Sequence, residues 1–252
     1  MATRHGSLVR AGDLAVVAEV RRSAEVAREA LKGQMAEAAA QVVAEERRAA
    51  ERRAAERRRA QLVCLRRAGV PERHELVLVA GGFDTTRKLS ADADAWYRSD
   101  RRLLGLGGAV GIGKSLTAAW LLARAPRRAW RNPNGTDSAW PSHLHPRWVR
   151  ASALARLDTY RAPELVALEA CCFLVIDEVG GGDVGAPASF AERLDMLVSG
   201  RYDAGLDTVL TSNLTEKEFR DLFGERLYSR MSGDAGVWVE RGGKDLRRKE
   251  AP

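Results

Sequence analysis

The chain has 252 residues, 45% of them hydrophobic, and a formal net charge of +7. That length suffices for one α/β domain with a sizeable core plus an extension, and the basic balance favours an anionic partner such as nucleic acid. No run of 18 apolar residues occurs and the first ten residues carry no apolar leader, so we expect neither a membrane span nor export. The three cysteines form no paired framework and no zinc-ligand spacing, which is typical of a cytoplasmic protein without a zinc module.

Residues 12–68 are predicted to form a helix, because Ala, Glu, Arg and Leu dominate this segment and proline is absent from it. From Glu45 to Ala60 the unit ERRAA recurs every five residues, which spreads the arginines around the helix axis. This block has no continuous row of large apolar residues along one helix face, which argues against a long coiled coil. Two interpretations remain open: a solvated, highly charged helix, or an arm that contacts nucleic acid or an acidic partner. We expect residues 1–68 to be a charge-rich, partner-binding arm.

After this arm, Gly69 and Pro71 break the helix, and a short helix is expected over 85–96. From Leu103 onward short apolar strands alternate with helices, which predicts a parallel sheet covered on both faces. The expected strands are LLGLGG (103–108), WVRAS (148–152), CCFLVIDE (171–178), DTVLTS (207–212) and GVWVER (236–241), and the expected helices are 114–124, 189–202 and 216–230.

A long surface loop is predicted over residues 126–146, which are rich in Pro, Gly, Asn and Trp. Basic groups combined with stacking aromatic rings are typical of surfaces that bind single-stranded nucleic acid. The candidates for such contacts in this loop are Arg127, Arg128, Trp130 and Arg131.

A phosphate-binding pattern lies in LLGLGGAVGIGKSLTAAWLLARA, where an apolar strand, a glycine-rich loop and a helix follow one another. In the pattern Gly-x4-Gly-Lys-Ser, backbone N–H groups and the helix N-terminus hold phosphates. Lys114 would bring a positive charge to the β- and γ-phosphates, and the Ser115 hydroxyl would ligate Mg²⁺. The alternative is an ordinary glycine-rich turn. We expect ATP to contact Gly108, Ala109, Val110, Gly111, Ile112, Gly113, Lys114, Ser115 and Leu116.

A second element, FLVIDE, places two carboxylates directly after an apolar run. A buried strand that ends in Asp177 and Glu178 would present them at the carboxyl edge of the sheet, where ligands bind in open α/β folds. Asp177 is a candidate Mg²⁺ ligand, and Glu178 is a candidate general base for the attacking water, which favours hydrolysis over binding alone. The alternative is an acidic strand end that faces solvent.

Polar and basic residues further along are candidates for contacts with the γ-phosphate. The strand expected at 207–212 runs into Asn213, whose amide would position water and sense hydrolysis; alone, Thr-Ser-Asn is a loop signal. Arg226 and Arg230 lie four residues apart and share one helix face. An arginine that reaches a neighbouring subunit's phosphate is an arginine finger, whereas the simpler interpretation is a surface ion pair.

Together these segments resemble the DnaC/IstB-like AAA+ ATPases, which are bacterial and phage helicase loaders and the ATPases that assist transposases. The resemblance covers residues 69–248 and rests on GAVGIGKS, FLVIDEVG, RYDAGLDTVLTSNLTEKEF, GERLYSRM and KDLR. The run RYDAGLDTVLTSNL followed by GERLYSRM is its most specific part. The N-terminal region shares no motif with a known helicase-binding domain.

The resemblance implies an α/β AAA+ P-loop fold over residues 69–252, with a parallel sheet of order 5-1-4-3-2 and a reduced lid. It implies ATP with Mg²⁺, and a homo-oligomeric ring or spiral in which the site lies between subunits. Asn213 would be the sensor of the γ-phosphate. Arg230 would be the finger that acts in trans, with Arg226 as its alternate. Arg247, in KDLR, would be a second sensor arginine.

Three functions remain open from the sequence. The first is an ATPase that loads a replicative DnaB-type helicase onto single-stranded DNA, with the arm gripping the helicase. The second is an ATPase that assists transposition by binding duplex DNA and a transposase. The third is a nucleotide-dependent adaptor with little hydrolysis, whose arm recruits a partner.

Overall fold

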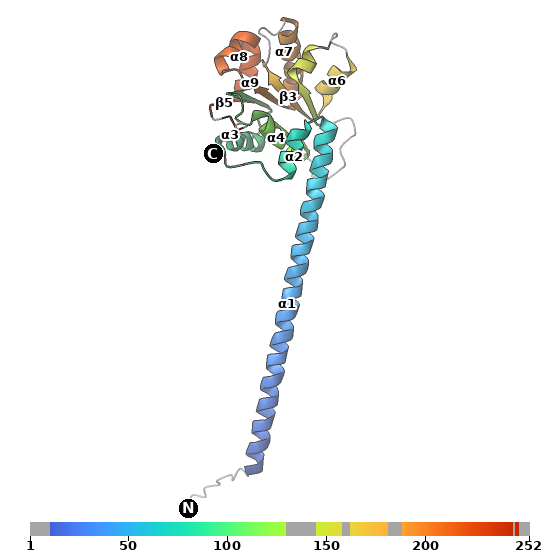
Figure 1. Ribbon diagram of the computed structural model, residues 1–252, viewed down its shortest axis with the longest axis vertical. Helices are drawn as coiled ribbons and strands as arrows, with labels where there is room; N and C mark the ends of the chain where they lie inside the picture. Colours follow the sequence, from blue (N-terminus) through green and yellow to red (C-terminus); the bar gives the residue numbers. More distant parts are fainter. Residues whose placement is uncertain (1–10, 130–144, 158–161, 181–187, 244, 247–252) are drawn as a thin grey trace, which may run out of the picture. The chain divides into compact units, whose positions relative to one another are not determined.

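The computed structural model describes residues 11–129, 145–157, 162–180, 188–243 and 245–246. Beyond residue 100 most helices and strands alternate along the chain (Figure 1). The helices are α1 (Ala11–Ala68), α2 (Glu72–Val79), α3 (Lys88–Arg98), α4 (Lys114–Ala129), α5 (Ala151–Ala155), α6 (Pro163–Ala170), α7 (Ala188–Asp203), α8 (Glu216–Phe223) and α9 (Glu225–Ser232). The strands are β1 (Leu103–Gly108), β2 (Arg147–Arg150), β3 (Phe173–Val179), β4 (Asp207–Ser212) and β5 (Gly236–Arg241).

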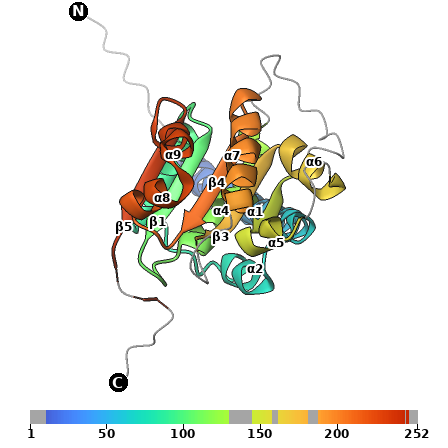
Figure 2. The ribbon, with the colours of Figure 1, turned by 90° about the horizontal axis from the view of Figure 1, so that it is seen from above.

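The strands of the described residues form one sheet of order β2-β3-β4-β1-β5, in which every neighbouring pair is parallel. Counted from β5, this is the predicted order 5-1-4-3-2, so the predicted fold class is confirmed. Helices lie on both faces of the sheet (Figure 2). Because all the strands run the same way, their carboxyl ends share one edge, and the segments that follow β1, β3 and β4 meet there.

Alternate side chains of each strand contribute to two apolar clusters, one on each face of the sheet. In β3, Phe173 and Val175 pack with α3 and α4, whereas Leu174 and Ile176 pack with α5 to α9. None of these four side chains is accessible to solvent. Burial on both faces explains why β3 shows a continuous apolar run in the sequence rather than an alternation.

The structure corrects several predicted element boundaries. The strand expected at 148–152 ends at Arg150, and its last two residues begin α5. The helix expected at 216–230 is divided at Gly224, whose φ of 86° lies in the left-handed region that interrupts a helix. The loop expected at 126–146 starts later, because α4 continues through Pro126 to Ala129. Helices α2 and α6 were not expected.

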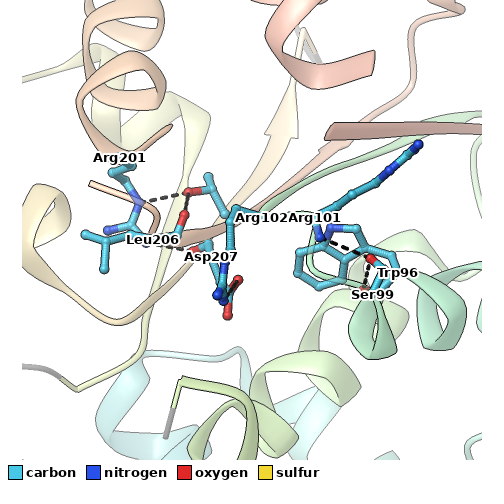
Figure 3. Close-up of polar contacts among 8 residues, drawn as sticks. Trp96, Ser99, Arg101, Arg102, Arg201, Leu206 and Asp207 are labelled. Atoms are coloured by element: carbon cyan, nitrogen blue, oxygen red, sulfur yellow. Dashed lines mark hydrogen bonds and ion pairs between the residues drawn. The ribbon is translucent and has the colours of Figure 1, made fainter. Parts of the chain in front are cut away.

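The amino-terminal edge of the sheet is fastened by the buried guanidinium of Arg201 at the end of α7. Its Nε donates to Thr208 Oγ1 at 2.9 Å, and another of its nitrogens donates to the Cys171 carbonyl oxygen at 2.7 Å. The remaining terminal nitrogen donates to the Asp207 carbonyl oxygen at 2.6 Å (Figure 3). The Asp207 carboxylate in turn pairs with Arg102, directly before β1, at 3.2 Å. One side chain therefore links the end of α7 to the segments that begin β3 and β4.

Helix α1 is uninterrupted from Ala11 to Ala68. The chain divides into two compact units, residues 1–57 and residues 58–252. In the second unit, Leu65 and Ala68 of the last turns of α1 are buried in the cluster with α3 and α4. Among the described residues, no helix is long and apolar enough to cross a membrane.

Candidate nucleotide-binding site

The carboxyl edge of the sheet brings together the glycine-rich loop and the ends of β3 and β4. The loop lies between β1 and α4, as predicted. The N–H of Gly108 donates to the carbonyl oxygen of Leu214, just after β4, at 3.3 Å. Strand β3 pairs with β4 along the same edge. Strand β4 lies between β1 and β3, so the two elements that the sequence predicts for phosphate and metal binding meet at the same edge on either side of β4.

The loop conformation depends on its glycines. Gly108, Gly111 and Gly113 have φ values of 107°, 82° and 98°, which side chains with a Cβ rarely adopt. Helix α4 begins directly after them, and the N–H of Thr117 donates to the Gly113 carbonyl at 2.8 Å. The free N–H groups of this first turn make the helix start a suitable anion site.

Lys114 lies inside the loop rather than in solvent. Its side chain is buried, and Nζ donates to the carbonyl oxygens of Gly108 and Ala109, both at 2.7 Å. These contacts hold the ammonium group beneath the loop. Of the other predicted loop contacts, Ile112 is buried, Ser115 and Leu116 are partly buried, and Ala109 and Val110 are exposed.

Asp177, Glu178 and Thr211 form a hydrogen-bonded group at the ends of β3 and β4. The Thr211 hydroxyl donates to Asp177 Oδ1 at 2.6 Å and accepts from the Glu178 N–H at 2.9 Å. One hydroxyl therefore fixes both acidic positions. The sequence analysis noted Thr211 only as part of a polar strand end, because its partners become apparent only from the pairing of β3 with β4.

The second carboxylate oxygen of Asp177 makes this residue a candidate ligand for a metal ion. The side chain is fully buried, and among the described residues Oδ2 has no hydrogen-bond partner. A buried carboxylate oxygen without a partner is costly unless a cation or water completes it. Mg²⁺ takes oxygen ligands and retains several waters, so Asp177 together with the Ser115 hydroxyl fits that ion.

Glu178 has a strained backbone. Its φ of 63° is the one left-handed value at a non-glycine residue in the described chain. It lies where the β3–β4 register is interrupted between Ile176 and Val179, and such bulges redirect side chains. Its side chain is exposed beside the buried Asp177. Strain of this kind concentrates at functional sites, which supports Glu178 as the candidate base.

Asn213 directly follows β4 and is exposed. No side-chain hydrogen bond involves it within the described residues, so its amide is available to a ligand. Its neighbour Ser212 is buried instead, and the Ser212 hydroxyl donates to the Val179 carbonyl at 2.7 Å. Asn213 is thus the polar group of this strand end that remains exposed.

The two arginines of α9 lie outside this group. Arg230 pairs with Asp195 of α7 at 3.4 Å, and Arg226 pairs with the other oxygen of the same carboxylate at 3.6 Å. Helix α9 leads into Gly236, which pairs with Leu103 at the start of β1, whereas the loop follows the end of β1. Neither arginine contacts the glycine-rich loop of its own chain, so a finger role for Arg230 requires a neighbouring copy.

The segment after β5 lies against the glycine-rich loop. The N–H of Ala109 donates to the Arg241 carbonyl at 3.3 Å, and the N–H of Leu246 donates to the Gly111 carbonyl at 3.0 Å. A Cβ at Gly111 would collide with the Asp245 carboxylate. The sequence analysis included Asp245 in the KDLR motif but assigned it no role. Arg247 lies outside the described residues, as do Trp130 and Arg131; Arg127 and Arg128 lie in the last turn of α4.

His74, which contacts β2, interacts electrostatically with Glu178 of the site. His74 of α2 packs on Trp148 with ring centroids 6.0 Å apart. The pKa of His74 is lowered from 6.5 to about 4, mainly by burial and also by the charges of Arg73 and Arg150, while the charge of Glu178 acts in the opposite direction. His74 is therefore neutral at physiological pH.

Comparison with known proteins gives likenesses in structure alone. No family model matches the chain, and no curated protein matches it. The DnaI structure is 16% identical, covering 66% of this chain and 88% of that one with a TM-score of 0.48. The DnaC helicase loader is 12% identical, with 63% and 93% covered and a TM-score of 0.46.

The third similar structure is AMPPCP-bound DnaA from Aquifex aeolicus, 16% identical, with 63% of this chain and 47% of that one covered and a TM-score of 0.47. The chain thus spans about half the length of this DnaA structure. The structure itself shows a five-stranded parallel sheet of order 5-1-4-3-2, with a glycine-rich loop between β1 and α4. The chain is therefore an α/β protein with the predicted strand order.

Proposed function

We propose that the protein binds and hydrolyses ATP with Mg²⁺. The observation that carries this proposal is the group of Asp177, Glu178 and Thr211 beside the glycine-rich loop. It combines a buried carboxylate oxygen that has no partner among the described residues with an exposed carboxylate on a strained backbone. A protein that only bound nucleotide would not need the second carboxylate.

Each residue of the site has a distinct role in this proposal. The loop N–H groups and Lys114 bind the phosphates, and Ser115 and Asp177 hold Mg²⁺, which neutralises charge on the phosphate oxygens when bound. Glu178 accepts a proton from the attacking water, and the Asn213 amide orients that water. Thr211 keeps the two carboxylates in place.

Completion of the site needs a second subunit. Arg230 does not reach the loop of its own chain, so in the proposal it acts on nucleotide bound by a neighbour in a homo-oligomer, with Arg226 as the alternate. Arg247 would approach the same nucleotide from the segment that follows Leu246, whose N–H contacts the loop.

The biological role that we propose is the loading of a replicative DnaB-type helicase onto single-stranded DNA, with residues 1–68 as the arm that contacts the helicase. The motifs GERLYSRM and RYDAGLDTVLTSNL, which resemble those of helicase loaders, support this role. The positive net charge supports contact with DNA.

Hydrolysis is tested with Glu178→Gln, which keeps the shape of the side chain but removes its basicity. We expect nucleotide affinity to be retained and turnover to fall by about a hundredfold. Glu240→Gln, on the exposed part of β5, is the matched control and should turn over like the wild type. Equal turnover of Glu178→Gln and the wild type would contradict the assignment of the base.

The role is tested by mixing the purified protein with the replicative helicase of its source, with and without ATP, and measuring the mass of the species. A stoichiometric complex that requires residues 1–68 supports helicase loading. No complex, together with turnover stimulated by duplex DNA, would instead favour a transposition helper. Nucleotide binding without DNA-stimulated turnover would favour an adaptor.

A further inference from the structure

The N-terminal part of α1 exposes an apolar stripe. Every side chain from Ala18 to Arg48 is exposed, including Leu31 at 57% and Met35 at 66%. Helices in proteins gain most of their stability from packing an apolar face, and this stretch has none packed. The missing packing must be supplied by another molecule if the stripe is to be buried.

The stripe has a regular period. Its members are Val16, Val20, Ala24, Ala27, Leu31, Met35, Ala38 and Val42. At about 100° per residue, they fall within an arc of about 100° on the helix surface. Their spacing repeats every 11 residues, as in Val20, Leu31 and Val42, and this period keeps a stripe nearly parallel to the helix axis. The alanines between the larger side chains allow a partner helix to approach closely.

Opposite charges flank the stripe. On one side lie Arg21, Arg28 and Lys32, about 70–110° from its centre, with Glu25 further round at about 130°. On the other side lie Glu19 and Glu37, about 110° from its centre. In a parallel pair of identical helices, the flank on one side of the stripe faces the opposite flank of the partner. A parallel pair therefore brings acidic flanks to basic flanks, whereas an antiparallel pair brings like charges together.

We propose that the stripe of residues 16–42 binds the same stripe on a second copy of this chain, as a parallel helix pair with right-handed supercoiling. This contact is distinct from the ATP-dependent subunit contact proposed above and does not rest on it. The highly charged block that starts at Glu45 lies outside the stripe and stays available to an acidic partner.

The first test measures self-association of the full chain by sedimentation equilibrium without nucleotide. The triple variant Val20→Gln, Leu31→Gln, Val42→Gln should weaken the association at least about a hundredfold, because it removes three of the five large apolar side chains of the stripe. The matched control is Val26→Gln with Val43→Gln; these valines are equally exposed but lie off the stripe, so the association should be unchanged. Far-UV circular dichroism checks that both variants keep the helix.

The second test addresses orientation. Glu19→Lys with Glu37→Lys makes both flanks basic, so a parallel pair should weaken by about tenfold or more. Adding Arg21→Glu, Arg28→Glu and Lys32→Glu swaps the flanks and should restore the association. An unchanged association after the first two substitutions would overturn the parallel arrangement.

Three further outcomes would overturn the proposal. One is a nucleotide-free wild type that is monomeric at every concentration measured. Another is equal weakening by the stripe variant and by its control. The last is a monomeric wild type whose stripe variant loses helicase binding, which would assign the stripe to that partner. Repeating the measurement in Lys114→Ala separates this association from assembly driven by nucleotide.

Discussion

The two edges of the sheet differ in how completely their polar groups are satisfied. At the amino-terminal edge, buried Arg201 donates to carbonyl oxygens and to the Thr208 hydroxyl, and Asp207 is paired with Arg102. At the carboxyl edge, Asp177 Oδ2 is buried without a described partner, and Asn213 is exposed. Both edges are built from the same strands. The polar groups of the first edge are paired within the described residues, whereas the second edge retains polar groups that have no partner there.

This difference separates stability from function within one sheet. Complete hydrogen bonding of buried groups holds an edge together, since each lost partner leaves a buried group unsatisfied. Incomplete hydrogen bonding destabilises an edge unless a ligand supplies the missing partners. We therefore expect substitutions at the amino-terminal edge to change the free energy of unfolding, and those at the carboxyl edge to change binding and turnover.

The largest expected effect is on stability. Arg201→Met should lower the free energy of unfolding by about 4 kcal/mol, because it leaves several buried carbonyl groups without donors. Urea unfolding measures the change. Exposed Arg156→Met is the control and should stay within about 0.5 kcal/mol of the wild type. A nucleotide affinity that fell in folded Arg201→Met would break the proposed separation of the edges.

At the opposite edge, Lys114→Ala should weaken ATP binding at least about a hundredfold, because the loop loses its buried positive charge. Calorimetric titration measures the affinity. Exposed Lys88→Ala, at the start of α3, should bind as the wild type does. Wild-type affinity in Lys114→Ala would remove the basis for a phosphate-binding loop.

A pair of substitutions within β4 compares the edges on a single strand. Thr211→Val removes the hydroxyl that joins Asp177 to Glu178, so turnover should fall by about tenfold. Thr208→Val removes the acceptor of Arg201 and should instead lower the free energy of unfolding by about 1–2 kcal/mol. Steady-state turnover and urea unfolding of both variants provide the test. If the two variants lost turnover and stability to the same extent, the proposed difference between the edges would be refuted.

The smallest effect expected is a dependence on pH. The pKa of His74 is about 4 in the folded protein, below its ordinary value of 6.5, so the unfolded chain binds a proton first as the pH falls. Stability should therefore decline between about pH 6.5 and about pH 4, by about 1 kcal/mol after allowance for solvent screening. His74→Phe should reduce the decline in urea midpoints over that range, and an equal decline in both proteins would contradict the assignment.

Local patterns of the sequence predicted a parallel sheet and the glycine-rich loop, whereas the strand order was implied by the resemblance to the DnaC/IstB-like ATPases. The glycine spacing and the apolar runs before Lys114 and Asp177 indicate a strand, a turn and a helix directly. The division of α8 from α9 is local too, but Gly224 in a helical pattern gives a weak signal. The site assignments themselves remain predictions that the proposed variants test.

The features that were missed depend on contacts between distant segments. Thr211 acquires its role only from the bulged pairing of β3 with β4, and Asp245 only because the chain returns to the loop after β5. Arg201 was not singled out, because an arginine near the end of a helix is ordinarily a surface residue. Arg201 and Thr211 lie in RYDAGLDTVLTSNL and Asp245 lies in KDLR, but a motif alone does not reveal which distant atoms these side chains contact.

The left-handed backbone at Glu178 implies a conflict between the stability of the folded protein and its activity. A glycine there would adopt the same φ of 63° without steric cost, so Glu178→Gly should give a more stable protein that has lost its base. Random mutation that is screened only for thermal resistance would therefore enrich inactive chains at this position.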